Sequence, residues 1–203
     1  MITIVDIGLS NVGSVQNMLR KLNAKSVITS DKHAIAKAEK IILPGVGAFD
    51  HAMKKLEELE LRDILLERAQ SGIPLLGICL GMQMLMDNSE EGRTPGLGLI
   101  PGKVKKFVFE DKKLKIPHMG WNEIEWSQEF PILKDLEKEE DVRFYFVHSY
   151  YAEPESSLNT MCTTFYGQNF ASGIIRDNVM GVQFHPEKSH RYGMRILKNF
   201  INF

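Results

Sequence analysis

The chain has 203 residues, 43% hydrophobic and 25% charged, with a formal net charge of −1 at pH 7. These values are typical of one globular domain with a sizeable core, and the balanced charge argues against binding to nucleic acid or to an anionic membrane. No apolar run is long enough to cross a bilayer, and strand-like Ile2–Asp6 follows the first residue, so we expect neither a membrane anchor nor a signal peptide. Two cysteines make no disulfide framework, which favours a cytoplasmic location.

The first half of the chain alternates strand and helix patterns. Short apolar runs predict strands over Ile2–Asp6, Ser26–Thr29, Lys40–Leu43 and Pro74–Ile78. Helical periodicity predicts helices over Gly13–Leu22, Phe49–Leu59 and Leu61–Gln70, with a shorter one near Asp31–Ala36. This alternation predicts an α/β fold with an open, mainly parallel central sheet and helices on both faces.

Short strands dominate the second half. They are predicted over Val104–Phe109, Leu114–Ile116, Asn122–Trp126, Arg143–Ser149, Met161–Tyr166, Ala171–Arg176 and Val179–Phe184. We expect some to extend the central sheet and others to form a smaller antiparallel flap, before a last helix from Ser189 to about Ile201. The charged stretch Lys134–Asp141 is interpreted as a solvated surface segment. No repeat or linker interrupts the pattern, so residues 1–203 are expected to form a single domain.

Cys79 lies at a junction that suits a nucleophile. The apolar strand ending at Ile78 is followed by a predicted helix over Leu80–Met86, and a glycine stands two residues to either side of the cysteine. A G-x-C-x-G turn between strand and helix is the thiol version of the nucleophile elbow, and the helix N-terminus favours a thiolate. The alternative is an inert core cysteine, which this segment alone does not exclude. Cys162, in a strand-like run without such a turn, is interpreted as structural.

A cysteine nucleophile needs a base and a group that orients the base. Of the six histidines, His33 and His51 lie in polar, helix-like surroundings that indicate the surface. His185 ends an apolar strand, and Glu187 follows on the same face, so its carboxylate can hold the imidazole as the acid of a serine triad does. The alternative is a strand-end histidine beside a surface glutamate. Neither C-x-x-C nor H-E-x-x-H is present, so we predict no metal site.

Acyl chemistry also requires hydrogen-bond donors for an oxyanion. The backbone N–H of Leu80, next to the cysteine, is one candidate. The glycine-rich turn Pro44–Ala48, through Val46 or Gly47, is the second, because backbone can approach a ligand closely there. A plain strand-to-helix turn is the alternative for this segment.

Taken in order, these motifs resemble the class I (triad-type) glutamine amidotransferases, which have a flavodoxin-like fold. The resemblance rests on the elbow Gly77–Gln83 and on Phe184-His185-Pro186-Glu187, and it covers essentially the whole chain. Within that family, the chain is most similar to the glutaminase subunits of imidazole glycerol phosphate synthases. The segments that carry this finer likeness are Asp6–Gly8, Leu43–Phe49, Pro117–Asn122, Phe146–Tyr150 and His185–Ser189.

The resemblance implies a reaction and roles for individual residues. Cys79 attacks the side-chain amide of glutamine and releases ammonia, and water then hydrolyses the glutamyl thioester without any cofactor. His185 shuttles protons, Glu187 orients it, and the oxyanion donors are those named above. The positions that hold glutamine in the family correspond to Gln83, Glu91, His148, Ser149 and Tyr150. Gln83 as an ordinary helix residue and His148 as a simple strand end are the alternatives.

The family also implies a partner. Free ammonia escapes in water, and one glutaminase domain leaves no room for a synthase, so another protein must take the ammonia. In the resembled subfamily this is a (β/α)8-barrel cyclase, bound as a heterodimer, which makes imidazole glycerol phosphate in histidine biosynthesis. Residues expected at that interface are Asn11, His118, Met119 and Trp121. For Trp121, packing into the chain's own core is the alternative.

Two positions depart from the subfamily pattern. Ser10 stands where glycine usually precedes the asparagine, and His190 follows Lys188-Ser189 where glycine is common. They leave open a paralogous subfamily that supplies ammonia to amidotransferases acting on surface-polysaccharide sugars. Two further classes remain as hypotheses: a non-catalytic interaction subunit, and a stand-alone hydrolase of γ-glutamyl or peptide bonds.

Overall fold

The computed structural model describes all residues, 1–203. Its strands are β1 (Ile2–Val5), β2 (Ser26–Thr29), β3 (Lys40–Gly45), β4 (Leu75–Cys79), β5 (Asn88–Ser89), β6 (Gly102–Lys106), β7 (His118–Glu123), β8 (Arg143–His148), β9 (Tyr150–Pro154), β10 (Thr160–Phe165), β11 (Asn169–Arg176) and β12 (Val179–Val182). Its α-helices are α1 (Val12–Lys21), α2 (Lys32–Ala36), α3 (Phe49–Glu58), α4 (Arg62–Gln70), α5 (Leu80–Met84) and α6 (His190–Asn202). None of the helices has the length and apolar character that a membrane span requires.

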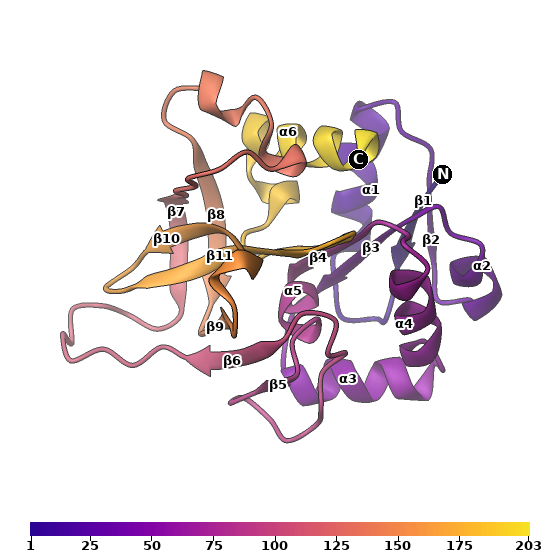
Figure 1. Ribbon diagram of the computed structural model, residues 1–203, viewed down its shortest axis with the longest axis horizontal. Helices are drawn as coiled ribbons and strands as arrows, with labels where there is room; N and C mark the ends of the chain where they lie inside the picture. The colour runs from indigo at the N-terminus through magenta and orange to yellow at the C-terminus, as the bar shows by residue number, and fades with distance from the viewer.

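One large sheet runs through the molecule in the order β2-β1-β3-β4-β12-β11-β9-β6-β5. The first five strands of this order pair in parallel, which reproduces the flavodoxin-like arrangement. Beyond β12 the pairing becomes antiparallel, apart from the short β5. Helices α3, α4 and α5 lie on one side of the sheet, and α1 and α6 on the other (Figure 1). The predicted α/β fold is confirmed.

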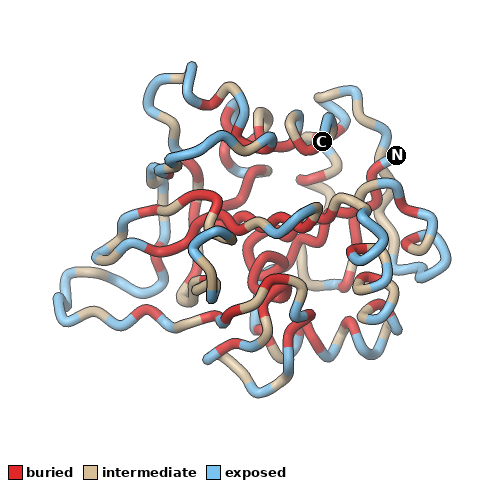
Figure 2. The backbone as a smooth tube through the Cα atoms, viewed as in Figure 1, coloured by how far each residue is buried: buried red, intermediate tan, exposed pale blue.

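Two apolar cores fill the space between the sheet and its helices. One joins the sheet to α3, α4 and α5 through residues such as Leu56 and Leu65, and the other joins it to α1 and α6 through residues such as Leu19 and Phe200. Buried backbone accordingly concentrates along the central strands, while the outer turns are exposed (Figure 2). This sandwich holds the carboxyl ends of β3, β4 and β12 side by side at one edge, where α/β sheets bind their ligands.

The small antiparallel flap is the β7–β8 sheet, and its position in the sequence corrects two predictions. Strand β7 begins at His118, four residues before the predicted Asn122–Trp126, because His118, Met119 and Gly120 pair with β8 although they form no apolar run. Leu114–Ile116 is not a strand, since it precedes Pro117, which has no N–H for a ladder, and its side chains are largely exposed. Strand β9, directly after β8, was not predicted separately.

Both termini lie at the edge opposite the carboxyl ends of the parallel strands. Met1 precedes β1, and the Lys40 ammonium at the start of β3 donates to the Phe200 carbonyl near the end of α6 (3.3 Å). Figure 1 places the two chain ends near each other and away from the β7–β8 flap.

Glycines allow α5 to approach β3 and β4 closely. A Cβ atom on Gly81 would lie 1.8 Å from the Leu43 carbonyl oxygen, and one on Gly77 would lie 2.6 Å from the Gly81 carbonyl oxygen. Neither contact is possible with a larger residue unless the backbone moves. The two glycines of the G-x-C-x-G motif therefore pack the helix directly against the strands around Cys79.

This packing gives a stability prediction. Gly81→Ala is expected to lower the free energy of unfolding by about 3 kcal/mol or more, because the methyl group meets rigid backbone. Gly13→Ala in α1 is the matched control, since the nearest heavy atom to its new Cβ is 3.9 Å away. Urea denaturation followed by circular dichroism measures both. Equal stabilities of the two variants would contradict the proposed close approach.

Candidate active site

Cys79 occupies a strained turn at the carboxyl end of β4. It is the junction between β4 and α5, with φ 55° and ψ −111°, and it is 6% exposed. A non-glycine residue with positive φ costs about 1–3 kcal/mol, and such strain persists where the surrounding structure imposes it. Here the glycine contacts described above hold both flanking elements in place. The conformation is that of a nucleophile elbow, as the sequence predicts.

His185 and Glu187 form the predicted pair, although strand β12 ends at Val182 and Pro186–Lys188 is a 3-10 helix, not the extended backbone expected from the sequence. The His185 Nδ1 lies 2.7 Å from the Glu187 Oε1, and both side chains are at least nine-tenths buried. The backbone around them is also fixed: His185 N–H donates to the Tyr145 carbonyl (2.9 Å), and the Ser189 hydroxyl accepts from Tyr145 N–H (3.0 Å) while donating to the His185 carbonyl (2.6 Å). Hydrogen bonds from strand β8 therefore fix the position of the turn that carries the His185 imidazole.

The surroundings of the His185 imidazole favour its charged form. Burial works against the imidazolium, but the neighbouring Cys79 and Glu187 outweigh it and raise the pKa of His185 to about 10. The other ring nitrogen of His185, Nε2, faces away from Glu187 and is buried without a hydrogen-bond partner. An imidazolium held next to a cysteine favours the nucleophilic thiolate and can later donate a proton to a leaving group.

A small cavity of about 120 Å³ adjoins this pair. Ser10 and Glu187 line it, and the Ser10 Oγ and Glu187 Oε2 atoms are buried without a protein hydrogen-bond partner. Ser10, one of the two departures from the subfamily pattern, thus adds a hydroxyl beside the orienting carboxylate. The remaining lining residues are Asn11, Val15, Pro44, Gly45, Val46, Ile78, His185 and Lys188.

The predicted oxyanion donors are only partly available. Leu80 begins α5, where a helix leaves its first N–H groups free. Val46 N–H instead donates to the Leu9 carbonyl at 2.7 Å, so it does not point toward an oxyanion in this conformation. Gly47 has φ 102°, a backbone state that favours glycine, and its N–H makes no protein hydrogen bond. For Val46 to be the second donor, its backbone would have to turn so that the bond to the Leu9 carbonyl breaks.

Several of the residues predicted to hold glutamine make hydrogen bonds within the protein. Glu91 Oε2 accepts from Phe49 N–H (2.8 Å) and so caps α3. Gln83 Nε2 donates to the Tyr150 carbonyl and to Gln183 Oε1, each at 3.0 Å. Ser149, next to Tyr150, accepts from Phe107 N–H through its carbonyl (3.1 Å). These contacts make Gln83 and Glu91 part of the framework in this conformation.

Gln183 was missed from the sequence. Its side chain is fully buried, and its Nε2 lies 3.7 Å from the Cys79 sulfur as a donor. The only signal was a polar residue within the apolar run Val179–Phe184, two positions before His185. The periodic pattern predicts a strand over this run, but it does not indicate a role for the Gln183 side chain.

His118 and His148 form a second buried pair. His118 Nδ1 lies 3.0 Å from His148 Nε2, because the two residues are register partners in the β7–β8 sheet. Burial lowers the pKa of His118 to about 4 and that of His148 to about 3, so both rings are neutral at pH 7. His118 is only 3% exposed, so its side chain lies inside the chain, and its contact with a partner stays a prediction.

The other predicted interface residues are at the surface. Asn11 caps α1 by accepting from Ser14 N–H (3.3 Å), Met119 is 62% exposed and Trp121 is 46% exposed. The Trp121 ring stacks on His190, with ring centroids 5.3 Å apart and planes 6° from parallel. His190 has φ 47°, which explains why glycine suits this position. Trp121 is therefore not a core residue of the chain.

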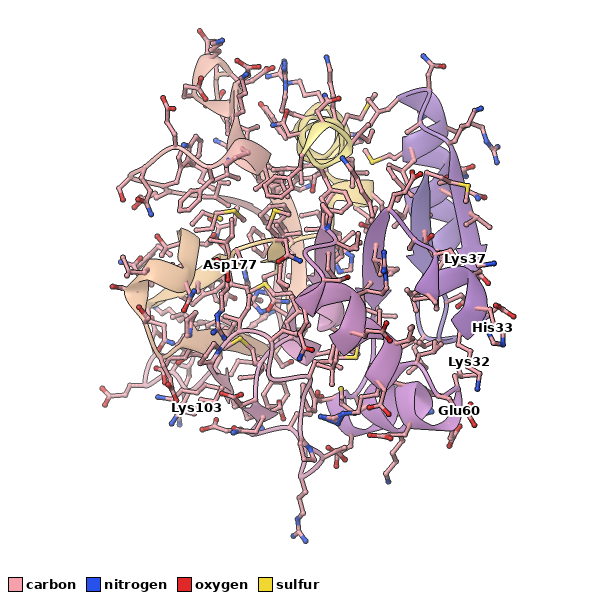
Figure 3. The ribbon with its side chains drawn as sticks, turned by 45° about the vertical axis from the view of Figure 1, so that its right-hand side comes forward. Lys32, His33, Lys37, Glu60, Lys103 and Asp177 are labelled. Atoms are coloured by element: carbon pink, nitrogen blue, oxygen red, sulfur yellow. The ribbon has the colours of Figure 1, made fainter.

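The remaining cysteine and histidines agree with their predictions. Burial raises the pKa of Cys162 to about 12, which leaves it an unreactive thiol. His33 and His51 are exposed, and Figure 3 shows His33 at the outer end of α2, near the surface ion pair of Lys32 and Glu60. Neither residue is part of the site.

Comparison with known proteins decides the family. The profile of the family described as "Glutamine amidotransferase class-I" matches residues 3–203. The chain belongs to the class I glutamine amidotransferases. As a member of this enzyme family it carries the cysteine, histidine and glutamate in the order that the motifs predicted.

Individual relatives refine the placement of this amidotransferase. It is 51% identical to "Imidazole glycerol phosphate synthase subunit HisH 2" of Methanococcus maripaludis over 99% of the chain and 98% of the relative. It is 46% identical to the protein of the same name from Pseudomonas aeruginosa, with the same coverage. Among solved structures, PurLQS from Thermotoga maritima has the same fold, with a TM-score of 0.72, 20% identity, and coverage of 99% of this chain and 97% of that one.

The buried histidines give a pH prediction. In the unfolded amidotransferase each takes up a proton near pH 6.5, whereas in the folded chain His118 and His148 resist protonation down to about pH 4 and about pH 3. The unfolded state therefore binds more protons below pH 6.5, and the free energy of unfolding falls as the pH drops. Between pH 7 and pH 5 we expect a loss on the order of 2 kcal/mol for each imidazole.

Urea denaturation at the two pH values measures this loss. His118→Asn removes one of the two titrating groups and is expected to reduce the difference between pH 7 and pH 5. His51→Asn removes an exposed imidazole and is expected to leave it unchanged. The same pH dependence in the wild type and in His118→Asn would show that the pair does not govern acid stability.

Proposed function

We propose that this chain is the glutaminase subunit of an imidazole glycerol phosphate synthase in histidine biosynthesis, with residues 1–203 as its single domain. The observation that carries the proposal is the buried His185–Glu187 pair beside the elbow cysteine Cys79. Full-length identity of 51% to a subunit with that synthase name supports the assignment. Its substrate is then glutamine, and its products are glutamate and ammonia.

The site supports a mechanism of two half-reactions. The Cys79 thiolate attacks the side-chain amide carbon of glutamine, and the carbonyl oxygen becomes an oxyanion at Leu80 N–H. The His185 imidazolium gives its proton to the amide nitrogen, the C–N bond breaks, and ammonia leaves a glutamyl thioester. His185, now neutral, takes a proton from water, whose oxygen attacks the thioester. The C–S bond then breaks, glutamate leaves, and the thiolate and imidazolium are restored. Glu187 stabilises each imidazolium.

A partner subunit completes the proposed function. Ammonia released here must be consumed by a second active site, and the relatives are named as subunits of a synthase. The subunit that consumes it is the cyclase, for which we propose a (β/α)8-barrel fold and a heterodimer with this chain. Met119 and Trp121 offer exposed apolar side chains on the flap for this contact. The bond from Val46 N–H to the Leu9 carbonyl supports low activity until the partner binds.

A paralogous role is the second candidate. Both relatives named above carry the numeral 2, and His190 departs from the subfamily pattern. Under this alternative the same glutaminase chemistry supplies ammonia to an amidotransferase for surface-polysaccharide sugars. The two candidates share Cys79 and differ only in the acceptor of the ammonia.

The reaction is tested by measuring glutamate release with and without a cyclase subunit. Wild-type chain alone is expected to be slow and to accelerate by about a hundredfold or more with the partner, as one oxyanion donor is worth about 10²–10³. Cys79→Ala is expected to be inactive in both cases, and Cys162→Ala to match the wild type. An inactive wild type with every candidate partner would favour a non-catalytic subunit, and rapid turnover of γ-glutamyl peptides without a partner would favour a stand-alone hydrolase.

The acceptor is tested by complementation. In a bacterial strain that lacks its own glutaminase subunit but retains the cyclase, the wild-type gene is expected to restore growth without histidine at limiting ammonium. The Cys79→Ala gene is the control and is expected not to restore it. Failure of the wild type, despite glutaminase activity with a sugar amidotransferase, would transfer the proposal to the paralogous role.

A further inference from the structure

A continuous chain of hydrogen bonds runs from the β7–β8 flap to the Cys79 sulfur. It begins at Asn122 on β7, passes through the His118–His148 pair to the Tyr150 carbonyl, and returns through two glutamines to the nucleophile. The donor–acceptor distances along it are 3.2 Å (Asn122 to His118), 3.0 Å (His118 to His148), 2.8 Å (His148 to Tyr150), 3.0 Å (Gln83 to Tyr150), 3.0 Å (Gln83 to Gln183) and 3.7 Å (Gln183 to Cys79).

One carbonyl oxygen determines the direction of every bond. The Tyr150 carbonyl can only accept, so the Nδ1 of His148 must carry the proton and its Nε2 must accept. Nδ1 of His118 is then the donor to His148, and Nε2 of His118 accepts from the Asn122 amide. Both rings must be neutral for this arrangement, which agrees with their lowered pKa values.

The same carbonyl orients the glutamines. Gln83 must present its NH₂ group to the Tyr150 oxygen, and its second N–H donates to Gln183 Oε1. With its oxygen engaged, Gln183 can only present its own NH₂ group to the sulfur. A donor aimed at sulfur stabilises the thiolate relative to the thiol, since hydrogen bonds to charged groups are the strong ones.

We propose that Gln183 is the hydrogen-bond donor that stabilises the Cys79 thiolate, and that His118 and His148 are positioning residues that hold Gln183 in this orientation from the flap. The proposal rests on the nucleophilic role of Cys79 described under the proposed function. It assigns roles to three buried residues, Gln183, His118 and His148, that take no part in the mechanism described above. It also makes the flap, whose outer face carries Met119 and Trp121, part of the active site.

The ionisable groups around the chain of bonds are few. Those that act on His148 are His118 and His185, and those that act on His185 are Cys79 and Glu187. Tyr166 stacks on His118, with ring centroids 4.1 Å apart. Any change in the titration of the Cys79 thiol that follows a change of Gln183 or His118 must therefore pass through these groups or through the hydrogen bonds themselves.

The test is the alkylation of Cys79 by iodoacetamide as a function of pH, with the adduct located by mass spectrometry. Cys162 is buried with its pKa raised to about 12, so the native chain reports on Cys79 alone. In Gln183→Met, which keeps the side-chain length and lacks a donor, the alkylation midpoint is expected to rise by about one pH unit. An unchanged midpoint would overturn the role of Gln183.

Variants of His118 test the positioning role. His118→Leu breaks the chain and is expected to raise the midpoint by about half as much as Gln183→Met. His118→Asn retains a donor near the Nδ1 position and is expected to restore a midpoint close to the wild type. Phe170→Leu is the packing control, because its ring contacts both imidazoles without a hydrogen bond. If Phe170→Leu shifts the midpoint as far as His118→Leu, the pair acts through packing and the positioning role is wrong.

The outcomes also separate this inference from the proposed function. Circular dichroism verifies the fold of each variant, and Gln183→Leu replaces Gln183→Met if the latter does not fold, since leucine also lacks a donor and adds no charge beside the sulfur. Alkylation needs neither glutamine nor a partner. A shifted midpoint in a chain without glutaminase activity supports the inference and contradicts the proposed function, whereas an unshifted midpoint in an active glutaminase does the reverse.

Discussion

The close approach of α5 to strands β3 and β4 is the constraint on which the rest of the site depends. Gly81 leaves no space for a methyl group beside the Leu43 carbonyl, and this contact fixes where the helix begins. Cys79 must then reverse the chain within one residue, in a conformation that ordinary residues avoid. The same geometry brings the sulfur next to His185, on the neighbouring strand's extension.

The features that sequence could predict are those encoded by a short run of residues. The elbow around Cys79 and the i, i+2 relation of His185 and Glu187 are local, so a motif suffices for both. The parallel half of the sheet follows from alternating strands and helices. By contrast, the His118–His148 pair depends on the β7–β8 register, and the hydrogen bond of Val46 depends on a distant carbonyl. Neither contact can be recognised from the neighbouring residues in the sequence. A single histidine in a sequence also does not show whether its side chain is buried.

The site contains two groups of histidines, one charged and one neutral. His185 is stabilised as an imidazolium by the groups on either side of it, whereas His118 and His148 are held neutral by burial. Each state suits its surroundings: the first must exchange a proton with reacting atoms, and the second must keep a fixed direction of donors and acceptors. Strand β8 supports both, since Tyr145 bonds the backbone of the His185 turn and His148 lies three residues further along the strand.

The placement of the two chain ends has a practical consequence for joining this subunit to others. Both ends lie at the amino edge of the parallel strands, whereas the nucleophile and the flap occupy other sides of the molecule. An affinity tag at either terminus would therefore leave the approach to the site unobstructed. A single polypeptide that fuses this chain to an ammonia-consuming enzyme would need a linker long enough to pass around the sheet. Short fusions would keep the two catalytic centres apart.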